Sequence, residues 1–507
     1  METTDQKQNL IKRNAPLEMS ADEFRQVGHD LVEQIASFLE KMPNGKVTEG
    51  EDPRQIRAHM NTPSLPSKGV SAQELFSKVP KLLFDHSLFN GHPKFFGYIT
   101  SSAAPIGALA DMLAASVNSN CGGYNLSPVA TEVEKQTVQW IAELIGFPSD
   151  CGGILVSGGN MANFVGFLAG RTNKANWDVR KNGVSNNSGR LVAYCSGAVH
   201  TWLEKGMDMY GFGTDSIRKI KTNNNFQMEI DALETQIQKD IEAGLTPFLV
   251  VGTAGSVSTG AIDPLYDISK ICKKYNLWFH VDGAYGAPAA VLPEAPAQLK
   301  GLSEADSVAV DPHKWLYAPL EAGCTLVRDP KHLLDTFSFH PEYYNFDNNE
   351  EDPSINFYEY GPQNSRGFRA LKVWLGIQQA GREGYIQMIR DDIELSNVLF
   401  QLVSRHAEFQ SFTNDLSIST FRYVPRDLDL SVEDMEQYLN ELNEKLVTEL
   451  QANGEAFLSN AIIDGKYCLR ACIVNFRTTL KDIEDLPEIV LRTGKVIDEN
   501  LRNSKSY

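Results

Sequence analysis

A lysine follows closely after a short apolar run in the sequence, where a charged side chain needs an explanation. Lys314 follows the run at residues 308–310 after an abrupt turn at Asp311 and Pro312. Lysine is among the residues that are least often buried, so a core strand that ends in one usually has a purpose. A lysine amine in a partly desolvated site can attack a carbonyl carbon as a nucleophile. The alternative is that the strand has reached the surface and that Lys314 is solvated.

Other residues with chemical capability stand at the ends of neighbouring apolar runs. Residues 157–160, Ser-Gly-Gly-Asn, lie between a strand-like run and a helix-like segment. The free N–H groups and the dipole of a helix start suit a phosphate group, although Gly-Gly before a helix is often only a tight turn. Asp282 and His200 each follow a further run. A carboxylate at a strand end needs a partner because its unpaired burial is costly, and a helix cap or an ion pair would also provide one.

Together these residue types match the requirements of one cofactor. The phosphate of pyridoxal phosphate needs an anion cradle, its pyridine nitrogen stays protonated beside a carboxylate, and a lysine forms the Schiff base. A histidine can lie flat on the ring. We therefore expect pyridoxal 5'-phosphate as the cofactor and Lys314 as the residue carried inward to reach it.

The elements that must position these residues are visible as an alternation of patterns. Helical patterns alternate with β-rich runs at residues 152–159, 190–196, 247–255, 277–286 and 307–311. This alternation predicts an α/β fold with a mostly parallel sheet wrapped by helices. In such sheets ligands bind at the carboxyl ends of the strands, which is where the polar residues lie.

The chain length of 507 residues predicts more than one domain. We expect an N-terminal helical arm at residues 1–95, a large cofactor-binding domain at 96–385 and a small α+β domain at 386–507. A capping-box pattern at Ser20 and Glu23 precedes an amphipathic helix in the arm. The polar, Pro- and Gly-containing residues 43–70 are interpreted as a connection, and residues 366–405 have a helical pattern.

Composition excludes several classes of partner. The net charge of −18 disfavours nucleic acids and anionic membrane surfaces. No run of roughly eighteen apolar residues is found, so we expect no membrane span, and the polar start of the chain gives no secretory signal. The seven cysteines are scattered without a CxxC pair, which favours a cytoplasmic protein over a disulfide framework or a zinc site. We expect no metal site.

The sequence resembles the group II pyridoxal-phosphate decarboxylases, the family of aromatic-L-amino-acid, histidine and glutamate decarboxylases. The likeness runs over nearly the whole length. It is carried by "HPKFFGYITSSAAPIGALADML", "SPVATEVEKQTVQWIAELIG", "HVDGAYG", "DPHKWLYAP", "RGFRALKVW" and "GKYCLRACIVNFRTT". The resemblance implies a fold-type I enzyme that works as a homodimer, with the N-terminal arm as a dimerisation element.

The resemblance also assigns roles to individual residues. Lys314 matches the Schiff-base lysine, Asp282 the partner of the pyridine nitrogen and His200 the histidine that stacks on the ring. Further matches for cofactor contacts are Gly159, Asn160, Thr253, Ala284, His313 and Ser365. Tyr343 falls where the family's catalytic loop carries a tyrosine that acts as proton donor, with neighbouring Tyr344 as the alternative. In the family this loop and the segment around Ser365 reach across from the other subunit.

The substrate is implied less directly. Tyr98, Ile99, Asn120 and Gly122 match substrate-pocket positions, and at Asn120 and Gly122 aromatic-acid decarboxylases usually carry bulky apolar residues. We expect decarboxylation of an L-amino acid, with an aromatic one favoured, to a primary amine and CO2. The alternatives are an acidic or smaller substrate, an oxidative aldehyde synthase, or a cofactor-binding scaffold without turnover. At the position three before Lys314, often asparagine in animal members, Asp311 is expected to bond backbone or point away from the phosphate.

Overall fold

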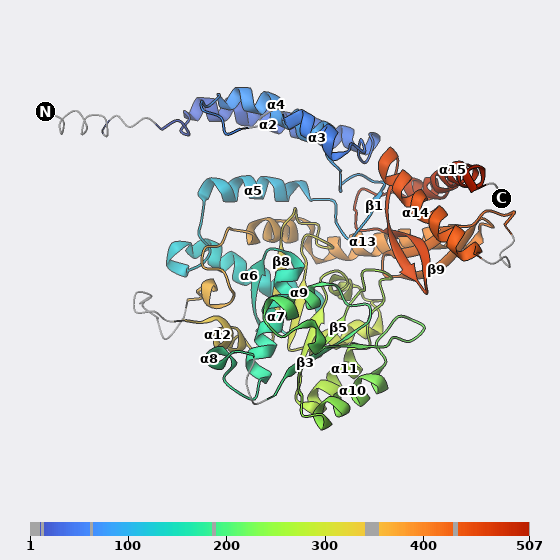
Figure 1. The fold of residues 1–507 in the computed structure, drawn as a ribbon. Helices are drawn as coiled ribbons and strands as arrows, with labels where there is room; N and C mark the ends of the chain where they lie inside the picture. The colour runs from blue at the N-terminus through green and yellow to red at the C-terminus, as the bar shows by residue number, and fades with distance from the viewer. Residues whose placement is uncertain are drawn as a thin grey trace.

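The computed structural model describes residues 11, 15–60, 64–184, 189–339, 354–428 and 434–505. Within these residues two sheets form the frame of the molecule, one of seven strands and one of five. Helices cover both, and a pair of long N-terminal helices lies apart at one end (Figure 1). No helix in these described ranges is long and apolar enough to cross a membrane.

The larger sheet has the strand order β2-β8-β7-β6-β5-β3-β4. Its strands are β2 Gly152–Val156, β3 Leu191–Ser196, β4 Ile217–Ile220, β5 Thr246–Thr253, β6 Trp278–Asp282, β7 Ser307–Val310 and β8 Gly323–Val327. All neighbours pair in parallel except β8, which is antiparallel to both β2 and β7. The prediction of a mostly parallel sheet wrapped by helices is confirmed. The sequence analysis did not include β4 and β8.

Helices cover both faces of this sheet because its strands are apolar on both sides. Ile154 and Val156 of β2 pack with α7 Gly158–Lys174 and α9 Trp202–Met209, whereas Leu155 packs on the opposite face. The opposite face is covered by α6 Pro128–Ile145, α10 Ile230–Glu242 and α11 Leu265–Tyr275. The remaining helices of this part are α5 Pro105–Val117, α8 Val179–Asn182 and α12 Lys331–Phe337. The result is a three-layer arrangement with its strand ends open to ligands.

The register of the parallel strands brings the predicted site residues to one edge. Thr253 pairs with Asp282, and Asp282 pairs with Ala309, each at or near the carboxyl end of its strand. The loop that carries Lys314 starts directly after β7. The chain therefore collects a hydroxyl, a carboxylate and an amine at neighbouring strand ends.

The smaller sheet belongs to the C-terminal part of the chain and has the order β1-β11-β12-β10-β9. Its strands are β1 Phe95–Phe96, β9 Phe409–Asp415, β10 Ile418–Tyr423, β11 Phe457–Ile463 and β12 Lys466–Cys472, with helices α14 Met435–Asn453 and α15 Leu480–Lys505. Helix α13 Ala370–Arg405 connects it to the larger sheet and is interrupted at Gly381, whose φ of 64° is not helical. Because β1 pairs with β11, the end of the N-terminal arm is built into this sheet.

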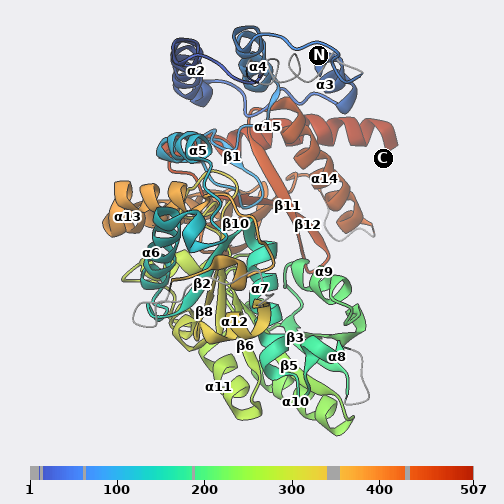
Figure 2. The same cartoon turned by 90° about the vertical axis from the view of Figure 1, so that its left-hand side faces the viewer.

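The N-terminal arm consists of α2 Ala21–Lys41, α3 Pro53–Met60 and α4 Ala72–His86. The predicted cap is confirmed, since the Ser20 hydroxyl accepts a hydrogen bond from the Glu23 N–H at 3.2 Å. Helix α3 corrects our interpretation of residues 43–70 as a plain connection. Its start is fixed by the Asp52 carboxylate, which accepts bonds from the N–H groups of Arg54 and Gln55. The arm lies at the same end of the molecule as α15 and opposite α10 and α11 (Figure 2).

Candidate active site

One cavity at the carboxyl edge of the larger sheet gathers most of the predicted site residues. The lining residues that the sequence predicted are Ile99, Gly159, Asn160, His200, Thr253, Asp282, Ala284 and Lys314. The lining residues that it did not predict are Asn163, Ala198, Gly255, Val257 and Tyr285. An amine, a carboxylate, an imidazole and a helix start thus face one space, although they are separated by up to 155 residues of sequence (Lys314 and Gly159).

Asp282 is held in place by a tryptophan. Its side chain ends β6 and is only 8% exposed. The indole N–H of Trp202 donates to Asp282 Oδ2 at 2.8 Å, and the Ala284 N–H donates to Oδ1 at 3.3 Å. These two bonds fix the carboxylate at the strand end. Trp202 is fully buried at the start of α9, and the sequence analysis did not identify it although it lies two residues after His200.

His200 lies at the exposed rim of the cavity. Its Nδ1 accepts a 3.2 Å hydrogen bond from the backbone N–H of Trp202, so a neutral ring carries its proton on Nε2. Desolvation by the surrounding protein lowers the pKa of His200 from its ordinary value, and the Asp282 carboxylate opposes this only in part. At neutral pH the residue is therefore an uncharged imidazole with one N–H to donate.

Lys314 forms an ion pair with Asp311 at the end of β7. The Nζ atom lies 3.1 Å from Asp311 Oδ2, and the Asp311 side chain is buried. Its second oxygen, Oδ1, has no hydrogen-bond partner among the described residues. The expectation that Asp311 bonds backbone or points away is wrong. The carboxylate faces the lysine and the helix start at Gly159, where an added Cβ would lie 2.5 Å from Oδ2.

The start of α7 has the features of an anion cradle. Ser157 stands at its N-cap without a side-chain cap bond, which leaves the first N–H groups of the helix available. Gly158 has a φ of 80°, a conformation that side chains rarely adopt, and any side chain at Gly159 would meet Asp311. Beside this start, the buried hydroxyl of Thr253 lacks a partner among the described residues. Uncapped amides, a close backbone approach and an orphan hydroxyl fit a phosphorylated cofactor.

A buried polar network connects the first turn of α7 to the sheet. Asn163 donates to the Gly159 carbonyl at 2.9 Å, and its Oδ1 lies 2.8 Å from His280 Nε2. His280 Nδ1 in turn lies 2.8 Å from Ser307 Oγ. Complete burial lowers the pKa of His280 to about 4, so the ring is neutral. The network links α7 to β6 and β7, and no sequence pattern pointed to it.

A second buried carboxylate fixes the loop that carries Lys314. Asp392 of α13 accepts hydrogen bonds from the indole N–H of Trp315 at 2.8 Å and from the Tyr317 hydroxyl at 2.7 Å. Burial raises the pKa of Asp392 to about 7. Trp315 and Tyr317, which follow Lys314 in this loop, are therefore tied to α13. The sequence gives no signal for this contact, because the partners are more than 70 residues apart.

The other predicted site residues do not line this cavity among the described residues of the chain. Tyr98 is half-exposed, Ser365 is exposed, and His313 is held beside the cavity by a 2.7 Å bond from Nδ1 to the Ala322 carbonyl. Asn120 Oδ1 accepts bonds from the N–H groups of Gly122 and Arg366 at 3.1 Å each. The turn at Asn120–Gly122 and the segment around Ser365 therefore lie side by side. Tyr343 and Tyr344 lie outside the described residues.

Comparison with known proteins gives the family. The model described as "Pyridoxal-dependent decarboxylase conserved domain" matches residues 53–423, and a "PDXDC1-like second central domain" matches residues 399–502. An aromatic-L-amino-acid decarboxylase of Bacillus atrophaeus is 32% identical over 95% of this chain and 97% of its own length. A phenylacetaldehyde synthase of a Rosa hybrid cultivar is 28% identical over 93% of this chain and 94% of its own length.

A solved structure has the same fold. The structure of Oryza sativa TDC with PLP and tryptamine superimposes with a TM-score of 0.87, at 24% identity, over 96% of this chain and 99% of that one. With the family match over most of the chain, the expectation of pyridoxal phosphate is confirmed. The chain belongs to the family of pyridoxal-phosphate-dependent amino-acid decarboxylases.

Proposed function

We propose that the protein converts an aromatic L-amino acid into its primary amine and CO2. The observation that carries this proposal is the convergence of Lys314, Asp282 and His200 on one cavity beside the uncapped start of α7. The aromatic side chain is supported by the Bacillus relative, which is named for aromatic L-amino acids and matches nearly the whole chain.

The residues of the cavity have distinct tasks in this reaction. When bound, pyridoxal phosphate supplies a conjugated ring that accepts the electron pair of the broken Cα–carboxylate bond. Asp282 holds a proton at the pyridine nitrogen, and its two hydrogen bonds keep the carboxylate aimed from the end of β6. The start of α7 and the Thr253 hydroxyl hold the phosphate end, and Lys314 provides the amine to which the cofactor is attached.

Two further groups act on the substrate. His200 is neutral at the rim and keeps its proton on Nε2, from which it donates to the substrate carboxylate while its face lies on the ring. Tyr343 delivers the proton that Cα needs after CO2 has left. Proton delivery decides the product, because an unprotonated Cα is open to oxygen and would give an aldehyde in place of the amine.

A panel of L-amino acids tests the proposal. The purified holoenzyme would be incubated with aromatic, acidic and small L-amino acids while CO2, amine and aldehyde are measured together. Amine and CO2 in equal amounts from an aromatic substrate are expected. Preference for an acidic or small substrate would contradict the aromatic assignment, and aldehyde with peroxide would show the oxidative reaction, which the Rosa relative makes the second candidate.

We also propose that the protein is a homodimer whose subunits share their active sites. Exposed apolar side chains repeat along one face each of α4 and α5, and monomeric proteins rarely expose such continuous patches. They are Leu75, Val79 and Leu83 on α4, and Leu109, Leu113 and Val117 on α5. The paired segments at Asn120–Gly122 and Ser365 belong, in this proposal, to the substrate wall of the neighbouring subunit's cavity.

The dimer can be tested by light scattering on the eluted protein. The parent should have twice the mass of the chain, and the pair Leu109→Lys with Leu113→Lys should shift it toward the monomer. The control is Ile241→Lys, an exposed apolar residue on α10, at the opposite end of the molecule from the arm (Figure 2). An unchanged mass in the double variant would contradict the assignment of this face.

We further propose a division into three domains and a cytoplasmic location. We divide the chain at residues 95/96 and 385/386, and the break at Gly381 in α13 supports the second boundary. The first boundary falls within β1, so the arm and the C-terminal part share a sheet.

A cytoplasmic location is supported by the seven cysteines. All of them are free thiols, as expected in a reducing compartment.

A further inference from the structure

Three side chains with metal-binding atoms meet in the N-terminal arm, far from the cofactor cavity. His59 Nε2 lies 2.9 Å from Glu51 Oε1, and His86 Nδ1 lies 2.6 Å from Glu51 Oε2. The two imidazole rings stack with their centroids 3.8 Å apart. One nitrogen of each ring and one oxygen of the carboxylate lie within 4.8 Å of one another. None of the three residues lines the active-site cavity.

Each of these side chains is held by a defined element. Glu51 directly precedes Asp52, whose carboxylate caps α3, and the Gln55 side chain returns a bond to the Asp52 N–H at 2.8 Å. This reciprocal cap fixes α3, and His59 lies in its last turn. His86 is the last residue of α4. The cluster therefore joins the connection after α2, helix α3 and helix α4.

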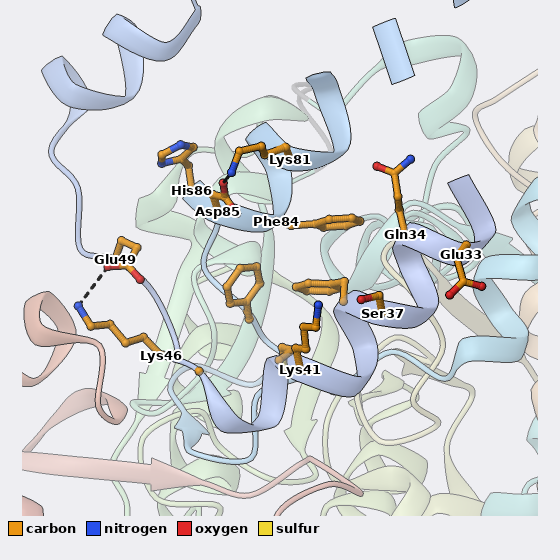
Figure 3. A pocket seen from close by; sticks show the side chains of 14 residues that line it. Glu33, Gln34, Ser37, Lys41, Lys46, Glu49, Lys81, Phe84, Asp85 and His86 are labelled. Atoms are coloured by element: carbon orange, nitrogen blue, oxygen red, sulfur yellow. Dashed lines mark hydrogen bonds and ion pairs between the residues drawn. The ribbon is translucent and has the colours of Figure 1, made fainter. Parts of the chain in front are cut away.

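Figure 3 shows His86 at the end of α4, on the side of the arm pocket opposite Glu33 and Gln34. Two of the three lysines that line this pocket are already paired, Lys46 with Glu49 and Lys81 with Asp85. Their charges are balanced and so do not oppose a cation at the cluster. The side chains of Glu51, His86 and His59 are 17%, 25% and 37% exposed, which leaves the site reachable from solvent.

The donor set selects a class of ion. Two imidazole nitrogens and one carboxylate oxygen suit Zn²⁺ and its borderline neighbours, whereas Mg²⁺ and Ca²⁺ prefer oxygen ligands throughout. With bonds of about 2.0–2.1 Å, tetrahedral ligands stand about 3.3–3.4 Å apart, so the 2.9 and 2.6 Å contacts need to open by about 0.4 to 0.8 Å. The exposed side chains His59 and His86 allow this change, and a water molecule completes the fourth position.

We propose that Glu51, His59 and His86 form a binding site for one divalent transition-metal ion of the Zn²⁺ class. On binding, the proton on the coordinating nitrogen of each ring moves to its other nitrogen, and the ion replaces the two hydrogen bonds to Glu51. The ion ties Glu51 and α3 to the end of α4, and Glu51 and His86 are 35 residues apart in the sequence. We expected no metal site from the sequence, and Glu51, His59 and His86 have none of the usual close spacing of metal motifs.

Zinc binding by the untagged holoenzyme tests the site. After dialysis against a chelator, calorimetric titration with ZnCl2 and elemental analysis should give one Zn²⁺ per chain, and MgCl2 should give no heat. His59→Ala should weaken binding by more than the ~10–100-fold that loss of an outer partner costs. His59 is the most exposed of the three, so its removal leaves the fold intact.

Two further variants keep the outcome unambiguous. Glu51→Gln, which keeps the size and shape of the side chain, should also lose the zinc. His29→Ala, on the exposed side of α2, should bind zinc like the parent and serves as the control. The proposal is overturned if the parent binds no more zinc than His59→Ala, or if both ligand variants keep the stoichiometry and affinity of the parent. In that case the cluster is a hydrogen-bonded clamp only.

Discussion

Trp202 holds both polar side chains that flank the cofactor position. Its indole N–H donates to Asp282 Oδ2 at 2.8 Å, and its backbone N–H donates to His200 Nδ1 at 3.2 Å. The first bond fixes the carboxylate, and the second fixes which nitrogen of the imidazole carries the proton. A single buried residue at the start of α9 thus orients two groups, one at the end of β6 and one in the connection after β3.

Replacing the indole should weaken cofactor binding. Trp202→Phe removes a hydrogen bond to a charged group, worth about 1.5–3 kcal/mol, so the affinity for pyridoxal phosphate should fall about 10–100-fold. The change is measured by absorbance titration of the cofactor-free protein. The control is Trp177→Phe, which loses only an exposed bond from its indole to the Gly183 carbonyl. Equal affinities in parent and Trp202→Phe would contradict the role of Trp202.

Removing the charge of Asp311 should strengthen cofactor binding. The carboxylate lies beside the helix start at Gly159 and also pairs with Lys314, so it repels the phosphate and holds the lysine amine in an ion pair. Asp311→Asn should bind pyridoxal phosphate about tenfold more tightly, since like charges about 4 Å apart cost roughly 1–4 kcal/mol. Asp208→Asn, an exposed change on α9, controls for net charge. Weaker binding in Asp311→Asn would show that the carboxylate instead supports the site.

The site residues at the strand ends were predictable because each polar residue closely follows an apolar run in the sequence. Asp282 and Lys314 follow apolar runs that became β6 and β7, and parallel register then had to bring them together. Strand β8 was missed because it has only five residues and pairs antiparallel with β7. The alternation of strands and helices in the sequence predicts only parallel neighbours. Helix α3 was missed because a cap at Asp52, and not a repeat of apolar residues, defines it.

Contacts across long stretches of chain could not be predicted. Trp202 and Asp282 are 80 residues apart, and Asp392 and Trp315 are 77 residues apart. Neither pair has a sequence pattern, since a buried polar contact depends on how the layers pack. For the same reason, the sequence did not reveal the hydrogen bond from Arg366 N–H to Asn120, which gives Asn120 a structural role in its own turn.

Stability should depend on pH through His280. Its pKa is about 4 in the folded protein and about 6.5 when unfolded, so the unfolded chain binds an extra proton between these values. The contribution to stability is complete above pH 6.5 and is lost as the pH falls toward 4, by on the order of 3 kcal/mol in total. Asp263 and Asp392, whose raised pKa values act in the opposite direction, are common to parent and variant and cancel in the comparison.

The measurement compares urea unfolding of the parent and His280→Gln at pH 7 and pH 5. The parent should be the more stable at pH 7, and the difference should narrow at pH 5 because only the parent must keep an imidazole neutral. A difference that stays constant or widens on acidification would contradict the assignment.

The proton donor of the loop should decide between amine and aldehyde. Tyr343→Phe should bind the cofactor normally and form about 10²–10⁴-fold less amine, as expected for loss of a general acid. With oxygen present, aldehyde, ammonia and peroxide should replace the amine. Tyr344→Phe is the matched control and should behave like the parent. If Tyr344→Phe loses the amine and Tyr343→Phe does not, Tyr344 is the proton donor. A full amine yield in both variants would exclude both tyrosines as the donor.

The attachment of the cofactor to Lys314 is the central claim, and borohydride reduction tests it most directly. The holoenzyme is reduced, digested and mapped by mass spectrometry. The account predicts a pyridoxyl group on the peptide that contains Lys314, and no labelled peptide from Lys314→Ala. A pyridoxyl group on any other lysine of the parent, at a comparable yield, would contradict it.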